Sequence, residues 1–369
     1  MSKELVVGWD ASEYLAFGKN MFSEYGYESI VRPPIWPIIL GLLWRIGFPM
    51  PITMKFLAFV IYATIPLITF FSFKDSRKYS GLIIISSPFF FKYSHELLSH
   101  ILATLFFVLA YSLSGPISGL FAVLSGLTRF TFFLSVPFIC WKDKKKWLTS
   151  IGAGLGYLIV MWLIKGNPFI QLISASETIN AAHYLWFWQK DFWFYLKALV
   201  FSPLLFLGLL SASRFTLGFL TSLLYFTLLP HKEYRFFIDM LPFISFSFSE
   251  KFKKLWPLVT VMGLFVGLCL PYYTGISEEM FDSIPDGASV VGMNPEVNAY
   301  KDVHFYPWFD YIREYNKSAE YCVYSDGAIP CNNDECELKK AEFLNMCKPL
   351  TEQFGYIVGI TQHPSLELE

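Results

Sequence analysis

The chain has 369 residues, of which 54% are hydrophobic, 19% aromatic and only 16% charged, whereas an ordinary globular domain carries about 25% charged residues. Its net charge is −1, which gives no basis for a nucleic-acid partner held by phosphate neutralisation. This excess of apolar residues excludes a soluble fold and predicts an all-α polytopic membrane protein. We expect about ten transmembrane helices with additional interfacial helices, and a small extracytoplasmic C-terminal α/β domain.

Before the first long apolar run, two segments are apolar but unsuited to spanning a bilayer. In the first, aromatic and apolar residues recur at helical spacing beside charged ones, namely Tyr14, Phe17, Met21 and Phe22. Residues 34–48 form a run of 15 that includes Arg45. Both patterns predict helices lying in the membrane interface, and we expect a third around Trp186, Trp188 and Trp193.

Ten further apolar runs are candidates for transmembrane helices, each of which needs about 17 to 25 residues. They cover residues 52–73, 81–93, 97–113, 117–127, 131–141, 147–164, 199–210, 217–229, 236–248 and 255–270. Several runs are short, so they must extend through their flanks or lie in a locally thinned bilayer.

Orientation follows from the Lys and Arg residues of the short loops, which favour the cytoplasm. Basic residues fill loops 74–78, 142–146 and 251–254, and Arg214 marks a fourth. With these loops inside, the N-terminal stretch, the turns at 92–96 and 231–236, the 165–197 loop and the tail after Pro271 lie outside. We therefore expect a multi-pass protein of the plasma membrane or endoplasmic reticulum whose first transmembrane helix is missing.

The polar tail sets the predicted domain boundary, with a transmembrane module over residues 1–274 and an extracytoplasmic domain over 275–369. A turn and strand signal predicts a β-strand at 288–293. The sequon Asn316-Lys317-Ser318 is consistent with the outer side.

Four cysteines of the tail, Cys322, Cys331, Cys336 and Cys347, permit three disulfide pairings. No His stands at finger-like spacing among them, so we favour disulfides over a zinc site, with the pairing left open.

Asp10 is the first candidate catalytic residue, because it precedes an interfacial helix and has Glu13 close by. An interfacial carboxylate can act as general base on a sugar hydroxyl that attacks an activated anomeric carbon. The alternative is a helix N-cap, since Asp before a helix accepts hydrogen bonds from free backbone N–H groups.

The second candidate is the run HKEYRF at 231–236, where His231, Lys232, Glu233 and Arg235 lie between two apolar runs. Cations on the outer side run against the usual preference of Lys and Arg for the cytoplasmic side, so they indicate a functional role. Such side chains are suited to the phosphate of a lipid-linked substrate, and the alternative is a short solvated turn.

Further candidates lie at predicted helix ends. Glu96 and His100 are four residues apart on one helix face, where they serve a site or form an ordinary interfacial turn. Arg129 either snorkels or binds an anion, and Arg32, before two prolines, is a candidate for the same phosphate. The sequence has no GxxxxGK[ST] and no HExxH, so ATP-driven transport and zinc proteolysis have no support.

The order of these elements resembles the GT-C superfamily of membrane glycosyltransferases. The resemblance rests on Asp10 with Tyr14, on Arg32-Pro33-Pro34 and on the segment 126–129, and it covers about residues 8–271. HKEYRF is similar to the His-Lys-Glu-x-x-Phe motif of dolichyl-phosphate-mannose-dependent mannosyltransferases of GPI-anchor and N-glycan assembly.

This resemblance implies inverting transfer of mannose or another hexose from a dolichyl- or polyprenyl-phosphate sugar, on the extracytoplasmic face, to a glycan, lipid-linked or protein acceptor. Asp10 would be the general base, with Glu13 and Tyr14 beside it. His231, Lys232 and Arg235 would bind the donor phosphate and Glu233 would orient them, with no nucleotide sugar, metal or other cofactor. The sequence departs from the family where His100 stands in place of an acidic residue.

Two other classes of function stay open. One is a lipid or polysaccharide transporter in which the outer charges line a pathway. The other is a noncatalytic scaffold whose C-terminal domain is the working part.

Overall fold

The structure is a computed structural model that is 71% helical with a small C-terminal sheet, as the composition and the polar tail predict. It describes residues 9–29, 31–94, 99–181, 190–211, 213–270, 278–292, 295–307, 319–325, 334–353 and 356–361. The chain forms two compact units. The sheet unit contains residues 9–29, 36–54 and the described tail, and the helical unit contains residues 31–35 and 55–270.

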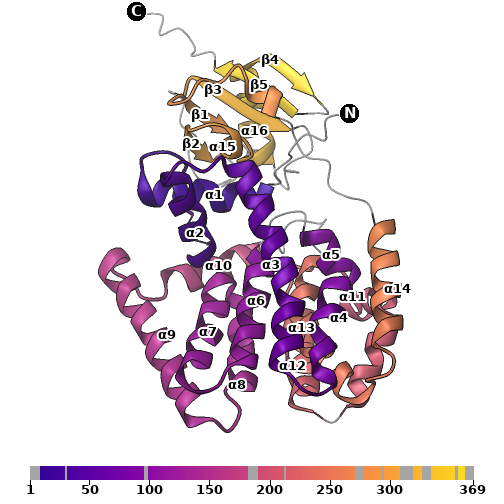
Figure 1. Ribbon diagram of the computed structural model, residues 1–369. Helices are drawn as coiled ribbons and strands as arrows, with labels where there is room; N and C mark the ends of the chain where they lie inside the picture. The colour runs from indigo at the N-terminus through magenta and orange to yellow at the C-terminus, as the bar shows by residue number, and fades with distance from the viewer. Residues whose placement is uncertain are drawn as a thin grey trace, which may run out of the picture. The chain divides into compact units, whose positions relative to one another are not determined.

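The helices coincide closely with the predicted apolar runs (Figure 1). The two interfacial segments become α1 (Trp9–Phe22) and α2 (Ile35–Arg45). The helices after them are α3 (Met50–Ser72), η1 (Ser76–Tyr79), α4 (Ser80–Ser86), α5 (Pro88–Ser94), α6 (Ser99–Ser112), α7 (Gly115–Thr128), η2 (Phe130–Ser135), α8 (Val136–Ile139), α9 (Lys144–Lys165), α10 (Ile170–Ala181), α11 (Phe194–Ala198), η4 (Leu199–Phe201), η5 (Pro203–Leu210), α12 (Arg214–Leu228), η6 (Tyr234–Phe236), α13 (Phe237–Lys251) and α14 (Trp256–Cys269).

Two helices of the described chain, α3 and α9, are long and apolar enough to cross a membrane, so ten full spans are not confirmed. Prolines explain part of the difference. The run 81–93 breaks into α4 and α5 at Ser87, directly before Pro88, because the residue before proline is driven out of the helical region. Pro137 and Pro203 lie in the runs that form η2 with α8 and the 3₁₀ segment η5.

Helix α13 is the centre of the helical unit and packs against α4, α6 and α12. Its residues 237–249 are all buried, including Asp239 and three serines. The outer helices show the opposite pattern, because their exposed side chains are large and apolar. Examples are Phe56 and Phe71 on α3, Leu163 on α9 and Phe265 on α14, which are 63%, 80%, 75% and 68% exposed.

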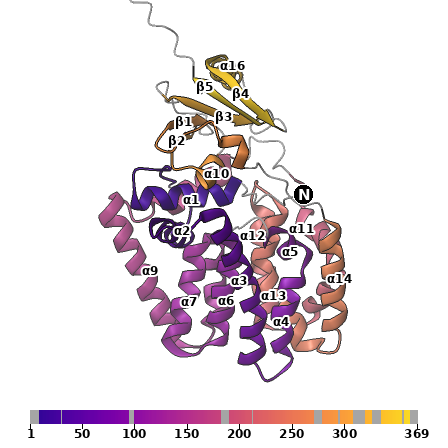
Figure 2. The ribbon, with the colours of Figure 1, turned by 45° about the horizontal axis from the view of Figure 1, so that its top comes forward.

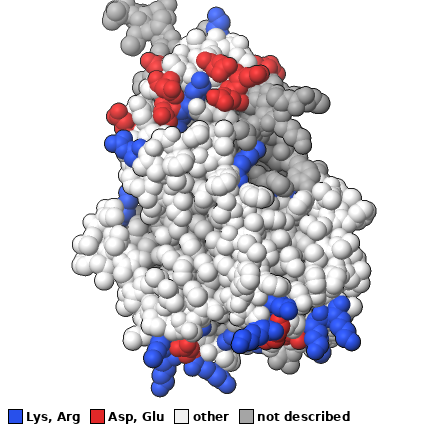
Figure 3. Space-filling model, in the orientation of Figure 1, with Lys and Arg blue, Asp and Glu red and all other residues white. Residues whose placement is uncertain are grey.

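The four basic loops gather at one end of the helical unit, where Lys and Arg form a row in Figure 3. The hydroxyl of Tyr111 accepts a hydrogen bond of 2.8 Å from Arg77, and Arg214 stacks 5.1 Å from the Tyr111 ring. Lys146 donates to the carbonyl of Leu113 at 3.2 Å. The loops that the charge pattern assigns to one side of a membrane therefore share one end of the helical unit.

The helices that border the basic loops differ in length. Helices α12 and α13 have 15 residues each, which corresponds to about 22 Å at the α-helical rise. Helices α3 and α9 have 23 and 22 residues, or about 34 Å. The two long helices therefore exceed α12 and α13 in length by roughly 10 Å.

The sheet unit holds a five-stranded sheet in the order β2-β1-β3-β5-β4. The strands are β1 (Ser289–Gly292), β2 (His304–Pro307), β3 (Tyr321–Ser325), β4 (Cys347–Gln353) and β5 (Tyr356–Thr361). The predicted strand at 288–293 is confirmed as β1, which pairs in parallel with β2 and β3. Strand β5 pairs antiparallel with β3 and β4. The short helix α15 (Val297–Tyr300) connects β1 to β2, and α16 (Asp334–Met346) precedes β4.

The N-terminal segment belongs to this unit because it completes the core of the sheet. Ala16 and Tyr27 pack in one buried cluster with Val290, Phe305 and Val358. The backbone of Gly26 also bonds to the segment of β2, through Val303 and Phe305.

A buried ion pair ties α1 to the tail. Lys19 is 2% exposed and donates to Asp302 at 2.6 Å, and the Trp44 indole donates to the same carboxylate at 3.0 Å. Burial lowers the pKa of Lys19, and Asp302 partly offsets this effect. Helices α1 and α2 approach closely (Figure 2), which is possible because Gly18 has no side chain. A Cβ at this position would lie 2.4 Å from the Pro37 carbonyl oxygen.

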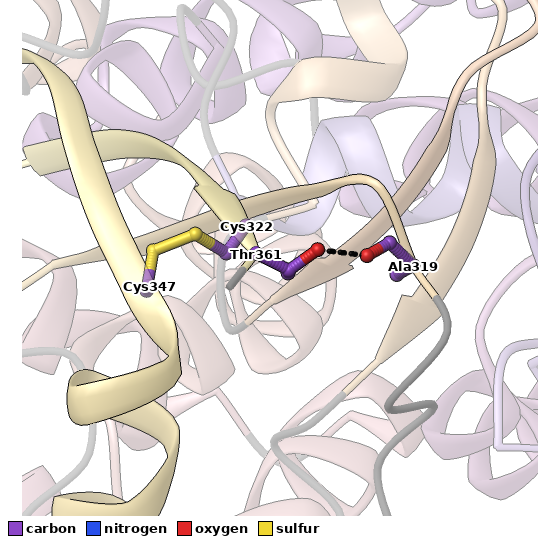
Figure 4. Close-up of a disulfide and its surroundings, with 4 residues drawn as sticks. All are labelled: Ala319, Cys322, Cys347 and Thr361. Atoms are coloured by element: carbon purple, nitrogen blue, oxygen red, sulfur yellow. Dashed lines mark hydrogen bonds between the residues drawn. A yellow bond between two sulfur atoms is a disulfide. The ribbon is translucent and has the colours of Figure 1, made fainter. Parts of the chain in front are cut away.

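A disulfide joins Cys322 of β3 to Cys347 at the start of β4 (Figure 4). The Thr361 hydroxyl donates to the Ala319 carbonyl nearby. The preference for disulfides is confirmed for this pair. Cys331 and the sequon at 316–318 lie outside the described residues.

We predict that Cys322→Ala with Cys347→Ala destabilises the sheet unit by about 3 kcal/mol, because the bond closes a loop of 25 residues. Thermal unfolding without reductant measures the loss, and the Cys140→Ala variant in the helical unit is the control. Equal unfolding temperatures for the double variant and the parent would contradict the prediction.

Candidate functional site

A buried carboxylate at the end of the helical unit away from the basic loops holds Arg129. Asp239 lies in the first turn of α13, where the helix dipole favours a negative charge. The Arg129 Nε donates to Asp239 Oδ1 at 2.8 Å and to Oδ2 at 2.7 Å. Thr131 Oγ1 donates to Oδ2 at 2.7 Å. Asp239 is therefore paired with a cation and hydrogen-bonded, as a buried charge requires.

The HKEYRF turn carries a second pair. Glu233 accepts a hydrogen bond of 2.7 Å from Arg235 through Oε1, and the same oxygen contacts His231 Nε2. The backbone N–H of Glu233 donates to the Tyr195 hydroxyl at 3.3 Å. Glu233 thus contacts His231 and Arg235, two of the three residues that the family resemblance expects it to orient.

Aromatic contacts fix the position of this turn. The Tyr234 ring stacks on Phe89 of α5 with centroids 5.3 Å apart, and it packs 4.6 Å from Phe194 of α11. Phe236 stacks on Phe226 of α12 at 5.5 Å. Alternate residues of the motif are therefore anchors in the helical unit, and the charged residues between them form the site.

The ring of Phe236 brings the two charged pairs together. Arg129 lies 5.3 Å from its centroid, Arg235 lies 5.8 Å away and the His231 ring lies 5.1 Å away. Arg129 and the HKEYRF turn, which are about a hundred residues apart in the sequence, therefore form one charged cluster. We define the charged cluster as Arg129, His231, Lys232, Glu233, Arg235 and Asp239.

Two cations of the charged cluster keep donors for a ligand. Among the described residues, Arg129 makes hydrogen bonds through Nε alone, so its two terminal amino groups have no protein acceptor. Lys232 donates to the Leu229 carbonyl at 2.7 Å and has no carboxylate within ion-pair distance in the described chain. Burial lowers the pKa of Lys232, and the carboxylate of Asp191 opposes this shift.

His100 and Arg32 also belong to this region. His100 of α6 is 2% exposed, and its Nε2 lies 3.8 Å from Asp239 Oδ1. It interacts electrostatically with Arg129 and Arg32. Arg32 is half-buried, and its carbonyl accepts a hydrogen bond of 3.3 Å from Gln171. Glu96 lies outside the described residues.

The predicted general base lies in the other unit. Asp10 is half-buried in the first turn of α1. Glu13 is 5% exposed and accepts a hydrogen bond of 3.2 Å from Ser29, and Tyr14 is 2% exposed. Within the sheet unit these three residues share one helix.

Sequence reasoning does not single out Asp239, which lies inside the predicted apolar run 236–248. A single charge inside a transmembrane segment is by default a candidate for function, and that signal was present. The partner, Arg129, is not given by any local spacing because 110 residues separate the two.

No family model, no curated protein and no solved structure matches this chain. Among the described residues, no group of three or more His, Cys, Asp and Glu is arranged to hold a metal ion.

We predict that single substitutions of the buried pair are strongly destabilising, by about 3 kcal/mol or more, because each leaves an uncompensated charge. Arg129→Met should lower stability more than Asp239→Leu, because it leaves the more deeply buried charge unpaired. The Asp239 side chain is 2% exposed, whereas that of Arg129 is 13% exposed. The double variant should recover most of the loss in thermal unfolding in detergent. Additive losses would show that the pair is not coupled.

Proposed function

We propose that this chain is a membrane glycosyltransferase of the GT-C type that transfers a hexose, mannose in the first instance, from a polyprenyl- or dolichyl-phosphate sugar. The observation that carries the proposal is the convergence of Arg129 and the HKEYRF turn on Phe236. The motif that the family resemblance assigns to the donor phosphate and Arg129, a candidate anion-binding residue, are thus parts of one charged cluster. The acceptor is a glycan, lipid-linked or protein hydroxyl.

Membrane embedding is supported by the surface of the helical unit. Its outer helices expose apolar side chains, and large exposed apolar patches mark contact with lipid or another protein. The basic loops at one end suit the cytoplasmic side. We propose that the shorter helices complete the bundle beside α3 and α9, to about ten in all.

The depth of the charged cluster suits a lipid-linked donor. Asp239 is 12 residues from Lys251 on α13, or about 18 Å along the axis, and a hydrocarbon core is about 30 Å thick. We propose that the charged cluster lies below the outer surface and that the donor phosphate reaches it from the outer leaflet.

The charged cluster holds Arg129, Lys232 and Arg235 against two carboxylates, Glu233 and Asp239, so its described residues carry an excess of one positive charge when histidines are neutral. The terminal amino groups of Arg129 offer a fork for a phosphate, and Lys232 offers a point charge. Both stabilise the phosphate as it leaves.

In the proposed reaction, Asp10 removes the proton of an acceptor hydroxyl as its oxygen attacks the anomeric carbon. A new C–O bond forms on the face opposite the phosphate. The bond between the anomeric carbon and the phosphate oxygen breaks, and its electron pair stays on that oxygen. The products are the glycosylated acceptor, with inverted configuration, and the polyprenyl phosphate.

The first prediction concerns Asp10. Purified full-length protein, given labelled polyprenyl-phosphate hexoses and a panel of acceptors in EDTA, should transfer the sugar. Asp10→Asn should lower the rate about 100-fold to 10,000-fold, as loss of a general base does, with donor binding retained.

Other outcomes of that assay identify the alternatives. A transporter would show movement of the labelled lipid without transfer and would be insensitive to Asp10→Asn. A scaffold would lose function on deletion of residues 275–369 and not on Asp10→Asn. Strict dependence on added divalent metal would contradict the mechanism proposed here.

The second prediction concerns pH. Lys232 binds phosphate only when protonated, and burial lowers its pKa. As pH is raised, donor affinity should therefore begin to fall before the pH reaches the ordinary lysine pKa of about 10.4. Because the folded state releases this proton more readily than the unfolded state, the contribution of Lys232 to stability rises as pH rises through the same window. Lys232→Arg should move the alkaline loss of affinity to higher pH. An unchanged profile would remove Lys232 from the site.

A further inference from the structure

His100 is a buried polar side chain close to Asp239. It lies in the first turn of α6 and is 2% exposed. Neither of its ring nitrogens has a hydrogen-bond partner among the described residues. A buried polar group without a partner destabilises a fold by about 1 to 3 kcal/mol. Its presence therefore calls for an explanation other than folding.

The distance to Asp239 indicates what His100 can bind. Nε2 lies 3.8 Å from Asp239 Oδ1, which is too long for a hydrogen bond between them. One oxygen atom about 2.8 Å from each would bridge the two. The bridging group must donate a hydrogen bond to the carboxylate and also bond to an imidazole nitrogen.

That requirement selects a hydroxyl. A hydroxyl donates one hydrogen bond and accepts others, whereas an ionised phosphate oxygen only accepts. The carboxylate of Asp239 would repel a phosphate at this point, whereas the terminal amino groups of Arg129 have no acceptor among the described residues. A hydroxyl therefore suits His100 and Asp239, whereas a phosphate suits Arg129.

We propose that His100 and Asp239 bind one hydroxyl of the transferred sugar, while Arg129 and Lys232 bind its phosphate. This inference rests on the proposed function and names the substrate class that its donor site reads, a sugar with a free hydroxyl near the phosphate. His100 is then a specificity-determining residue, and Asp239 also positions Arg129 through its Nε.

The test combines His100 variants with donors that lack one hydroxyl each. His100→Phe keeps a ring of similar size and removes both nitrogens, and His100→Gln keeps a donor and an acceptor. Initial rates are measured with the polyprenyl-phosphate hexose and with its monodeoxy analogues. Thr104→Val is the matched control, since Thr104 is buried on the same helix and its hydroxyl also has no partner in the described chain.

We expect His100→Phe to lower kcat/KM for the full donor about 10-fold to 100-fold, the equivalent of one hydrogen bond to a charged network. One monodeoxy donor should be a poor substrate of the parent enzyme. For this donor, His100→Phe should not lower kcat/KM further, because both changes remove the same contact. His100→Gln should restore part of the rate. Thermal unfolding of His100→Phe should occur at the parent temperature or above it.

Three results would overturn the inference. Losses that add for every monodeoxy donor would show that His100 touches no sugar hydroxyl. Unchanged rates with a raised unfolding temperature would show that the pair binds an internal water alone. Transfer by neither the parent nor any variant would overturn the proposed function, and this inference with it, whereas an active parent with an indifferent His100 overturns the inference alone.

Discussion

The helical unit is organised around a carboxylate that has no access to bulk solvent. Asp239 lies in α13, the most buried helix of the unit, and an ionised carboxylate there is tolerated only with a cation and hydrogen-bond donors in place. Arg129 and Thr131 supply these from the segment that follows α7. This requirement draws the end of α7 to the start of α13, and the HKEYRF turn directly precedes that start. The position of the charged cluster therefore follows from one buried pair.

The same pair determines which donor groups of Arg129 remain for a ligand. Asp239 binds Nε of Arg129, so among the described residues the terminal amino groups of Arg129 have no acceptor, and Asp239 also lies 3.8 Å from His100. Replacing a buried ion pair by apolar residues often leaves stability unchanged or raises it. Stability alone therefore gives no reason for an ion pair at this position.

Each unit carries one feature that bears on the compartment it is proposed to face. The basic loops share one end of the helical unit, as cytoplasmic loops do. The disulfide between Cys322 and Cys347 lies in the sheet unit, and disulfides persist in oxidising compartments. This bond is the feature of the sheet unit that motivates the proposal of an extracytoplasmic tail.

Much of the helical fold can be predicted from apolar runs, because burial in lipid or protein requires long apolar stretches and their ends coincide with those of α3, α9, α12 and α14. The number of full spans cannot be predicted from the apolar runs, because prolines divide or shorten the helices that some of these runs form. The strand β1 is also readable from its local pattern. The packing of Ala16 and Tyr27 into the core of the sheet is not, because no local signal links residues nearly 300 positions apart.

For the site, the residue types of HKEYRF indicate anion binding, and Arg129 can be proposed from its place at a helix end. The coupling of Arg129 to Asp239, and the gathering of His231 and Arg235 about Phe236, depend on long-range packing that spacing does not encode. Asp239 itself is a separate case, since its sequence signal is one charge among apolar neighbours and is lost when hydrophobicity is averaged over a window.

The most direct test of the central claim is binding of polyprenyl phosphate, without a sugar, to the full-length protein in lipid nanodiscs. The account predicts saturable binding that weakens with salt and falls at least 10-fold with Lys232→Met, while Lys74→Met at the basic end leaves it unchanged. Equal affinities of the parent and both variants would show that the charged cluster is not a lipid-phosphate site.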